Sequence, residues 1–250
     1  MFKYPTNRYK NKLKRSTDPN KHGLYIMKIL VTGATSGIGL ETVKLLASEG
    51  HQVVATGRNQ NKLTELESLD NCTAIQADLS SPNQTLAMFQ QAHETLAGID
   101  VLINNAGMNS RKCPIDEFTL EEFDLQYAIN LRAPALLSRE ALKAMKPSKQ
   151  GYIINVVSTV AKRANETMSI YTAMKQGFAG FSSILMKEAQ PHGIKVTTLF
   201  PGGTDTNFRE ADRPEYMSAK GVAKTINHIL ELPEDIVMHE MTFRPLVELE

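Results

Sequence analysis

Short runs of apolar and β-branched residues alternate along this chain with longer segments in which apolar residues recur every three or four positions. The short runs are typical of buried strands, and the longer segments of amphipathic helices. Strands are predicted at residues 28–32, 52–56, 73–76, 101–104, 152–157, 195–200 and 236–243. Helices are predicted at residues 38–48, 61–69, 84–97, 120–145, 170–190 and 219–232.

The alternation of strand and helix predicts the α/β class. Each strand returns to the next through a helix that buries its apolar side on the sheet, so the strands are expected to lie parallel. We therefore predict a single Rossmann-like, doubly wound domain at residues 27–250, with a seven-stranded parallel sheet and helices on both faces. Ligands of such sheets bind beyond the carboxyl ends of the strands.

Residues 1–26 differ from the rest of the chain in charge. They hold seven Lys and Arg residues against the single Asp18, a net charge of +6, whereas the remaining residues sum to −5. Pro5 and Pro19 interrupt the helix that an organelle presequence would need. We expect a basic extension outside the fold; binding to an anionic surface and an organelle address are the alternatives.

Composition narrows the class of protein further. A chain of 250 residues that is 42% hydrophobic and 22% charged can bury a sizeable core, which excludes a disordered protein. The balance of 28 Lys and Arg against 27 Asp and Glu argues against a general nucleic-acid binder. Two cysteines, Cys72 and Cys113, form no disulfide framework and fit a reducing compartment, here the cytoplasm. The apolar runs are too short to span a membrane, which takes roughly 20 residues.

A glycine-rich turn joins the first predicted strand to the first predicted helix. Gly33 permits a tight turn, and Gly37 and Gly39 lack the Cβ atoms that would obstruct a pyrophosphate. Backbone N–H groups and the positive end of the helix dipole would face the phosphates. The turn comprises Thr32, Gly33, Thr35, Ser36, Gly37, Ile38 and Gly39, around Ala34.

Two further motifs follow the glycine-rich turn along the chain. Asn105-Ala106-Gly107 comes after the fourth strand, and Tyr171 stands four residues before Lys175. With the TGxxxGxG turn, these motifs make residues 27–250 resemble the short-chain dehydrogenase/reductase family. The resemblance implies a nicotinamide cofactor bound by the turn and by Asp78, Leu79, Asn105, Ala106, Gly107, Tyr171, Lys175, Pro201, Gly202, Thr204 and Thr206.

The choice between the two nicotinamide cofactors depends on the end of the second strand. No carboxylate stands there to bind both ribose hydroxyls of NAD, and Arg58 offers a fork of donors to a 2′-phosphate instead. We predict NADP(H), with NAD(H) as the alternative if Arg58 is only a solvated loop residue. Asp78 matches the family position that contacts adenine, although an acid near a helix N-terminus is also an ordinary structural feature.

Tyr171 and Lys175 share one face of a predicted helix, about one turn apart. A phenol has a reference pKa of about 10, and a neighbouring cation favours its phenolate, so Lys175 would make Tyr171 a better proton donor. By resemblance, Ser158 hydrogen-bonds the substrate carbonyl and Asn130 supports a water-linked proton relay. The predicted reaction is hydride transfer between NADP(H) and a carbonyl or alcohol.

The segments that follow the fourth, fifth and sixth strands are expected to bind a small-molecule carbonyl or alcohol substrate. Their cations could attract an anion, their apolar residues could line a pocket, and any one charge could simply be solvated. The segments are residues 108–113, 159–168 and 207–217, with cations Arg111, Lys112, Lys162, Arg163 and Arg209 and apolar residues Met108, Met168 and Phe208.

Other functions stay open as alternatives. The same fold could serve as a cofactor sensor or scaffold whose basic tail binds an acidic partner, although such a protein would not need the Ser-Tyr-Lys set. A sugar-nucleotide epimerase or dehydratase would need a larger carboxyl-terminal domain. The six histidines and two cysteines do not have the sequence spacing of metal ligands, so no metal site is predicted. The long helices at 120–145 and 170–190 match those through which family members form dimers or tetramers.

Overall fold

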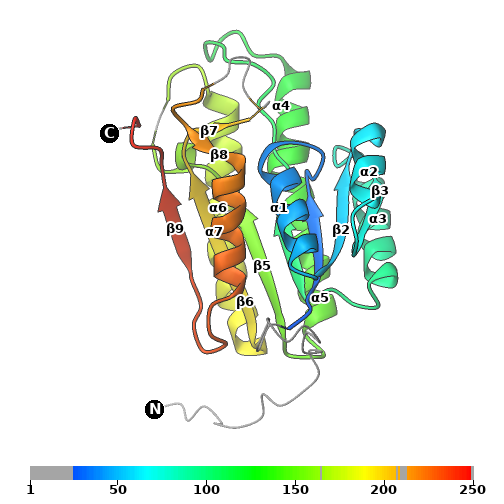
Figure 1. The fold of residues 1–250 in the computed structure, drawn as a ribbon. Coiled ribbons are helices and arrows are strands. Elements are labelled where there is room, and N and C mark those ends of the chain that lie inside the picture. The colour runs from blue at the N-terminus through cyan, green and yellow to red at the C-terminus, as the bar shows by residue number, and fades with distance from the viewer. Residues whose placement is uncertain (1–24, 164, 207, 209–212, 249–250) are drawn as a thin grey trace, which may run out of the picture.

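The computed structural model describes residues 25–163, 165–206, 208 and 213–248. Seven parallel strands form one sheet in the order β3-β2-β1-β4-β5-β6-β9, which confirms the predicted fold class. In Figure 1 the sheet lies behind α1 and α7, with β9 at its left edge and β2 and β3 on its right. The strands are β1 (Lys28–Thr32), β2 (Gln52–Gly57), β3 (Cys72–Gln76), β4 (Val101–Asn104), β5 (Gly151–Val156), β6 (Ile194–Pro201) and β9 (Glu240–Phe243).

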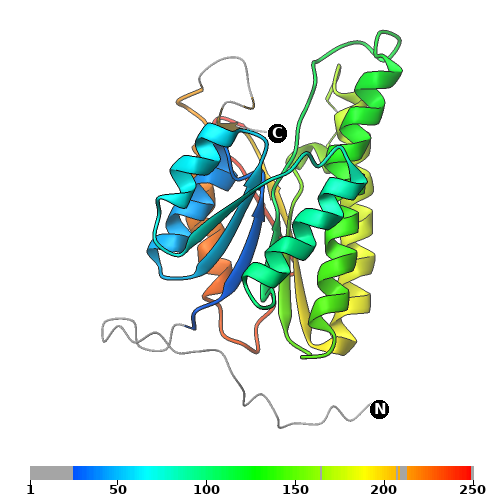
Figure 2. The same cartoon turned by 90° about the vertical axis from the view of Figure 1, so that its right-hand side faces the viewer.

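Helices cover both faces of this sheet, as Figure 2 shows. One layer holds α1 (Gly37–Ser48), α2 (Gln60–Glu67) and α7 (Ala219–Leu230). The other holds α3 (Pro82–Thr95), α4 (Leu120–Tyr127), α5 (Ala133–Met145) and α6 (Ser169–Ala189).

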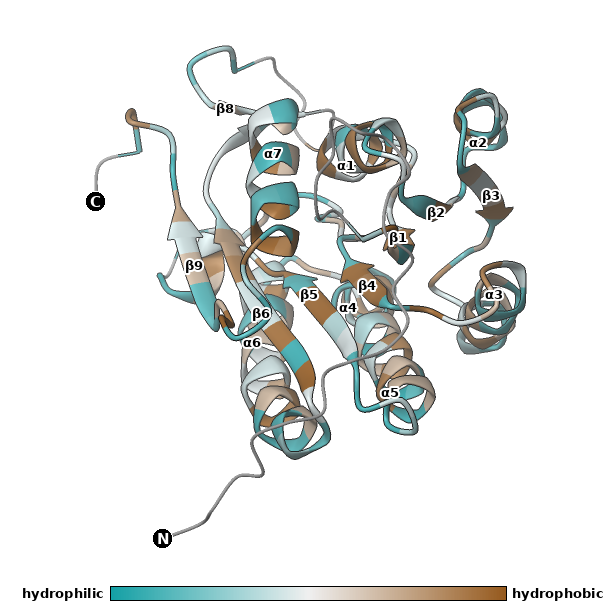
Figure 3. Ribbon diagram, turned by 60° about the horizontal axis from the view of Figure 1, so that its bottom comes forward, coloured by the Kyte–Doolittle hydropathy of each residue, from teal (hydrophilic) through white to brown (hydrophobic). Residues whose placement is uncertain are grey.

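Among the described residues, the two largest apolar cores lie between the sheet and these layers, because alternate strand residues point to opposite faces. Leu30 and Val54 face α3, α5 and α6, whereas Ile29 and Val31 face α1 and α7. Figure 3 shows the apolar strands in the middle of the molecule and polar residues on the outer sides of the helices. Burial on both faces explains why the central strands are continuous apolar runs rather than alternating ones.

The direction of strand order reverses between β1 and β4. From β1 the chain proceeds outward to β2 and β3, and then returns to the other side of β1 to build β4, β5, β6 and β9. Loops on the two sides diverge at this point and leave a crevice beyond the carboxyl ends of β1 and β4. The glycine-rich turn and the Asn105-Ala106-Gly107 segment both begin there.

Beyond shifts of one or two residues at the ends of elements, three features differ from the sequence-based prediction. The last strand begins at Glu240 rather than at residue 236, because the side chains of Lys195 and Thr197 bind the carbonyls of Ile236 and Met238 and so hold that stretch as a loop. The helix predicted at 120–145 contains a π-helical turn, Ala128–Arg132, between α4 and α5. Two short strands, β7 (Thr204–Asp205) and β8 (Met217–Ser218), form a small second sheet that the pattern did not reveal.

Candidate active site

The glycine-rich turn between β1 and α1 is shaped by its lack of side chains. Gly33 has a φ of +66°, and a Cβ atom on it would lie 2.8 Å from the Cα atom of Ala106. A Cβ atom on Gly39 would lie 2.2 Å from the carbonyl oxygen of Gly33. Any side chain at either position would therefore push the turn away from β4 or from α1. Thr35 lies against Gly57 at the end of β2.

The amino terminus of α1, which begins at Gly37, suits a phosphate group. The side chain of its N-cap residue, Ser36, makes no capping hydrogen bond, and the first turn of α1 contains no acidic residue. The first N–H groups of a helix and its dipole attract an anion, and here no side chain of the turn neutralises that attraction. The turn thus fits the pyrophosphate of a dinucleotide.

Thr32 and Asn105 join the two loops on either side of the crevice. The Thr32 hydroxyl oxygen accepts hydrogen bonds from the main-chain N–H groups of Asn105 and Ala106, both at 3.0 Å. The Asn105 amide in turn donates to the carbonyl oxygen of Thr32 at 2.9 Å. Their side chains therefore fix the shape of the crevice rather than projecting into it.

The Pro201–Thr206 segment closes the crevice from the β6 side. The N–H of Gly202 donates to the carbonyl of Phe243 at 2.8 Å, which ties the segment to β9, and Thr204 is buried. The methyl carbon of Thr206 lies 3.0 Å from where a Cβ atom of Gly37 would be. Two segments that are 169 positions apart in the chain, at residues 37 and 206, thus meet at the start of α1.

Arg58 and Asp78 differ in how the fold uses them. Arg58 is exposed just after β2, and within the described residues its guanidinium makes no hydrogen bond or ion pair. The Asp78 carboxylate accepts a hydrogen bond from the N–H of Ser80 at 2.9 Å, so it stabilises its own loop, and Leu79 is buried. Arg58 is therefore available to an anionic ligand, and Asp78 already has a structural partner.

Lys175 is a buried cation in α6. Only 3% of it is exposed, and its Nζ donates to the carbonyl of Val156 at 3.3 Å. Burial lowers its pKa from 10.5 to about 8. Nζ lies 5.7 Å from the centroid of the Tyr171 ring, one helical turn away, which confirms that the two side chains share a face of α6.

Asn130 and Gly107 complete the surroundings of Lys175. The Asn130 amide is fully buried in the π-helical turn, where it accepts from the N–H of Met108 at 3.0 Å and donates to the carbonyl of Met108 at 2.8 Å. A Cβ atom on Gly107 would lie 3.2 Å from both Asn130 Oδ1 and Lys175 Nζ. The fold thus gathers four predicted site positions, Gly107, Asn130, Tyr171 and Lys175, around one point.

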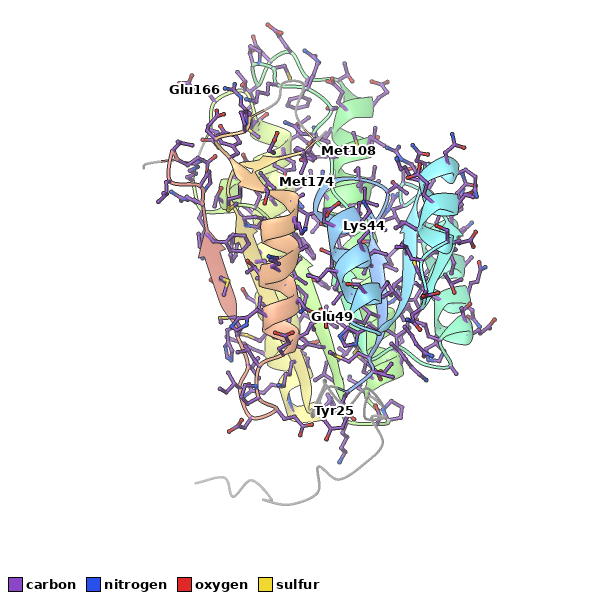
Figure 4. All side chains as sticks on the ribbon, in the orientation of Figure 1. Tyr25, Lys44, Glu49, Met108, Glu166 and Met174 are labelled. Atoms are coloured by element: carbon purple, nitrogen blue, oxygen red, sulfur yellow. The ribbon has the colours of Figure 1, made fainter. Side chains whose placement is uncertain are left out.

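Ser158 lies two residues beyond the end of β5, at the same edge of the sheet. Its hydroxyl oxygen accepts a hydrogen bond from the N–H of Val160 at 3.3 Å and begins a short 3₁₀ helix, Thr159–Ala161. In Figure 4 the labelled Met108, which Asn130 binds, lies toward this end of the molecule, and Tyr25 lies at the opposite end.

The cations of the substrate loops are mostly paired. Arg111 binds Glu122 at 2.6 Å, Lys162 binds Glu240 at 3.0 Å, and Arg163 lies 3.6 Å from Glu248. Their charges are therefore already partly neutralised by carboxylates of the same chain. Arg209 lies outside the described residues, while Phe208 packs on Tyr171, with 5.8 Å between ring centroids.

Gln126 was not singled out from the sequence, yet it is buried beside Tyr171. It lies in α4, four residues before Asn130, and lines a small hollow together with Tyr171. A polar residue within one helical turn of a predicted site residue is the signal that could have found it.

The described residues lack both a membrane-spanning helix and a cluster of metal-ligating side chains. No helix in that part of the chain is long and apolar enough to cross a membrane. Nor do these residues contain a group of three or more His, Cys, Asp or Glu side chains placed to hold a metal ion.

Comparison with known proteins is consistent with this geometry. The family model described as short chain dehydrogenase matches residues 27–217. An uncharacterized oxidoreductase of Staphylococcus aureus (strain USA300) is 30% identical over 224 residues, which is 87% of this chain and 96% of the relative.

Solved structures agree. Serine dehydrogenase from Escherichia coli superposes with a TM-score of 0.81 at 26% identity, covering 89% of this chain and 99% of the other. A short chain dehydrogenase from Burkholderia cenocepacia J2315 in complex with NADP has a TM-score of 0.77 at 29% identity, covering 87% and 96%.

Proposed function

The chain belongs to the short-chain dehydrogenase family and is an oxidoreductase of that family, and we propose that it transfers hydride between NADP(H) and a small carbonyl or alcohol. The observation that carries this proposal is the arrangement around Lys175. A buried cation lies beside Tyr171, Asn130 and Gly107, at the edge of the sheet where the glycine-rich turn also lies.

For the cofactor we propose NADP(H) rather than NAD(H). The uncompensated start of α1 would hold the pyrophosphate, and the unpaired guanidinium of Arg58 would hold the 2′-phosphate. The NADP complex of the Burkholderia relative supports the same choice. Asp78, Leu79 and the Pro201–Thr206 segment would line the two ends of the dinucleotide.

Proton transfer is assigned to Tyr171. When bound, the reduced nicotinamide supplies the hydride that adds to the carbonyl carbon. Tyr171 donates its phenolic proton to the carbonyl oxygen, and the Ser158 hydroxyl hydrogen-bonds the same oxygen and orients it. Lys175, which with a pKa of about 8 is mostly protonated at neutral pH, stabilises the phenolate left on Tyr171. Alcohol oxidation uses the same groups in reverse.

Asn130 would act through the main chain. Both ends of its side-chain amide are bound to Met108, so the amide holds the loop after β4 in place. Any part in a water-linked relay to Lys175 then falls to the main-chain carbonyl of Asn130. This residue lies in the π-helical turn, a form of helix that recurs at functional sites.

We place the enzyme in a reducing compartment, the cytoplasm, because both described cysteines are free thiols.

The experiment that tests the function is calorimetric titration of the protein with NADPH and with NADH, followed by turnover of aldehydes and ketones. We expect tighter binding of NADPH, and NADPH-dependent reduction of at least one carbonyl class. The variant Tyr171→Phe should bind NADPH as the wild type does and lose turnover by a factor of at least about 100. Undiminished turnover in Tyr171→Phe would refute the proton-transfer role, and absence of binding to either cofactor would favour the scaffold alternative.

A further inference from the structure

Gln126 has a buried polar atom that the fold leaves unsatisfied. The residue is 1% exposed, and its Nε2 donates to the hydroxyl of Ser110 at 3.0 Å. Its Oε1, however, is shielded from solvent and has no hydrogen-bond partner among the described residues. Buried amide groups are almost always paired, because an unmade hydrogen bond in the interior carries a free-energy penalty.

The surroundings of Gln126 indicate what could pair with it. A hollow of about 10 Å³ beside it is also lined by Tyr171, Asn109 and Thr167. That volume holds roughly one water molecule or one hydroxyl group. The hollow is closed where the loop after β4 meets the loop after β5, through the hydrogen bond from the N–H of Cys113 to the carbonyl of Thr167 at 3.0 Å.

Charge is a poor candidate for recognition in this hollow. Arg111 is the one cation that lines the hollow. Its Nε donates to the carboxylate of Glu122, and its Nη2 donates to the carbonyl of Glu117. Its charge is therefore compensated before any substrate arrives. What is left unpaired is the neutral amide oxygen of Gln126, which a neutral hydrogen-bond donor satisfies best.

From these contacts we infer that Gln126 binds a hydroxyl group of the substrate that does not react, on a carbon near the reacting carbonyl. The inference rests on the proposed function, because it is Tyr171 that places the reacting carbonyl next to the hollow. A hydroxyl both donates and accepts, so it complements the Gln126 amide in either orientation. It takes the place of one water molecule, which a simple ketone would leave in the hollow. The substrate class is thus hydroxyketones and diols rather than simple ketones and alcohols.

The test compares matched substrates that differ by one hydroxyl. Rates of NADPH-dependent reduction are measured for 2-butanone, 3-hydroxy-2-butanone and 4-hydroxy-2-butanone, and for acetophenone against 2-hydroxyacetophenone. We expect kcat/KM of the wild type to be about tenfold or more higher for a hydroxyketone than for its parent ketone. In Gln126→Met, which keeps the length of the side chain, this ratio should fall toward one, mainly through a higher KM for the hydroxyketone.

Two further variants separate recognition from a structural role. Gln126→Glu keeps a side-chain oxygen that can accept a hydrogen bond from the substrate hydroxyl. It should retain a several-fold preference for the hydroxyketone over its parent ketone. It is also the variant to measure if Gln126→Met does not fold. Gln90→Met, an exposed glutamine of α3, should leave the ratio unchanged. Thermal unfolding followed by circular dichroism checks that each variant is folded.

The outcomes distinguish the two proposals. A wild-type ratio near one, or an unchanged ratio in Gln126→Met, overturns the role of Gln126 and leaves the oxidoreductase function standing. Loss of activity by the same factor on both members of a pair shows a structural role and also overturns it. Failure of every ketone and hydroxyketone to react counts against the proposed function, and the inference falls with it.

Discussion

Lys175 shows at the scale of one residue how a position proposed for catalysis reduces stability. Its pKa of about 8 in the fold lies below the unfolded value of 10.5, because burial disfavours the ammonium. Between these values the unfolded chain binds more protons than the folded one, so folding stability rises as the pH increases through this window. Below pH 8 the full penalty applies, about 3 kcal/mol from the size of the shift.

We therefore expect Lys175→Met to stabilise the cofactor-free protein at pH 7, by up to about 3 kcal/mol, while abolishing turnover. Denaturant unfolding at pH 7, 9 and 10.5 measures the difference. The advantage of the variant should shrink as the pH rises, since the wild type then folds with a neutral lysine. A difference that is the same at all three pH values would show that Lys175 is not the titrating group.

In the proposed cofactor site, Arg58 alone would select between NADPH and NADH. It is exposed, and its guanidinium makes no hydrogen bond or ion pair with the described residues, so replacing its side chain should not disturb the fold. We expect Arg58→Ala to weaken NADPH binding by about ten- to a hundredfold, through loss of a charge-assisted pair with the 2′-phosphate, and to leave NADH binding nearly unchanged. Calorimetric titration of both cofactors gives the two constants. Equal weakening of NADPH and NADH would contradict this assignment.

At the scale of elements, a chain of buried side chains joins the strands to the helix that carries Tyr171. Asn104 of β4 donates through Nδ2 to both Asn155 of β5 and Ser138 of α5, at 2.9 Å each. Asn155 in turn donates to Ser182 of α6 at 2.9 Å. Because β5 leads into Ser158, the network sets the position of α6 relative to this serine.

Removing the middle of the network should affect both stability and activity. We expect Asn155→Leu to lower the free energy of unfolding by about 2 kcal/mol, since hydrogen bonds to Asn104 and Ser182 are lost, and to reduce kcat several-fold. Thermal unfolding and steady-state kinetics measure the two effects. The control Thr73→Val, on an exposed position of β3, should change stability by less than about 0.5 kcal/mol. Destabilisation with an unchanged kcat would mean that α6 keeps its place without the network.

The elements themselves were largely predictable because the sheet is buried on both faces. Runs such as 101–104 and 152–157 are too short for buried helices and lie between helical segments, which favours strands. The start of β9 was not predictable, since it depends on Lys195 and Thr197, which lie some 40 positions earlier in the chain. The π-helical turn at Asn130 and the hollow at Gln126 likewise arise from tertiary contacts that leave no periodic signal.

For the whole molecule, the unexplained surface is the outer side of the α4–α6 layer. Leu120 is 74% exposed and Ile184 55%, and Phe123 and Tyr127 lie on the same helix as Leu120. Large apolar side chains exposed on one helical layer favour an association surface there. A twofold dimer would bring this layer of one protomer against the same layer of its partner, so each copy would cover the other.

We therefore expect a dimer or tetramer in solution, which light scattering at micromolar concentration would show as two or four times the chain mass of 27.7 kDa. The double variant Leu120→Lys with Ile184→Lys should shift the mass toward that of one chain, because burying two unpaired ammonium groups against the partner opposes association. Thr64→Lys, on exposed α2 in the other helical layer, is the matched control and should leave the mass unchanged. A wild-type protein with the mass of one chain would show instead that this apolar face is covered by no second copy. Because α6 also carries Tyr171 and Lys175, dissociation of an assembled wild type should lower activity along with mass.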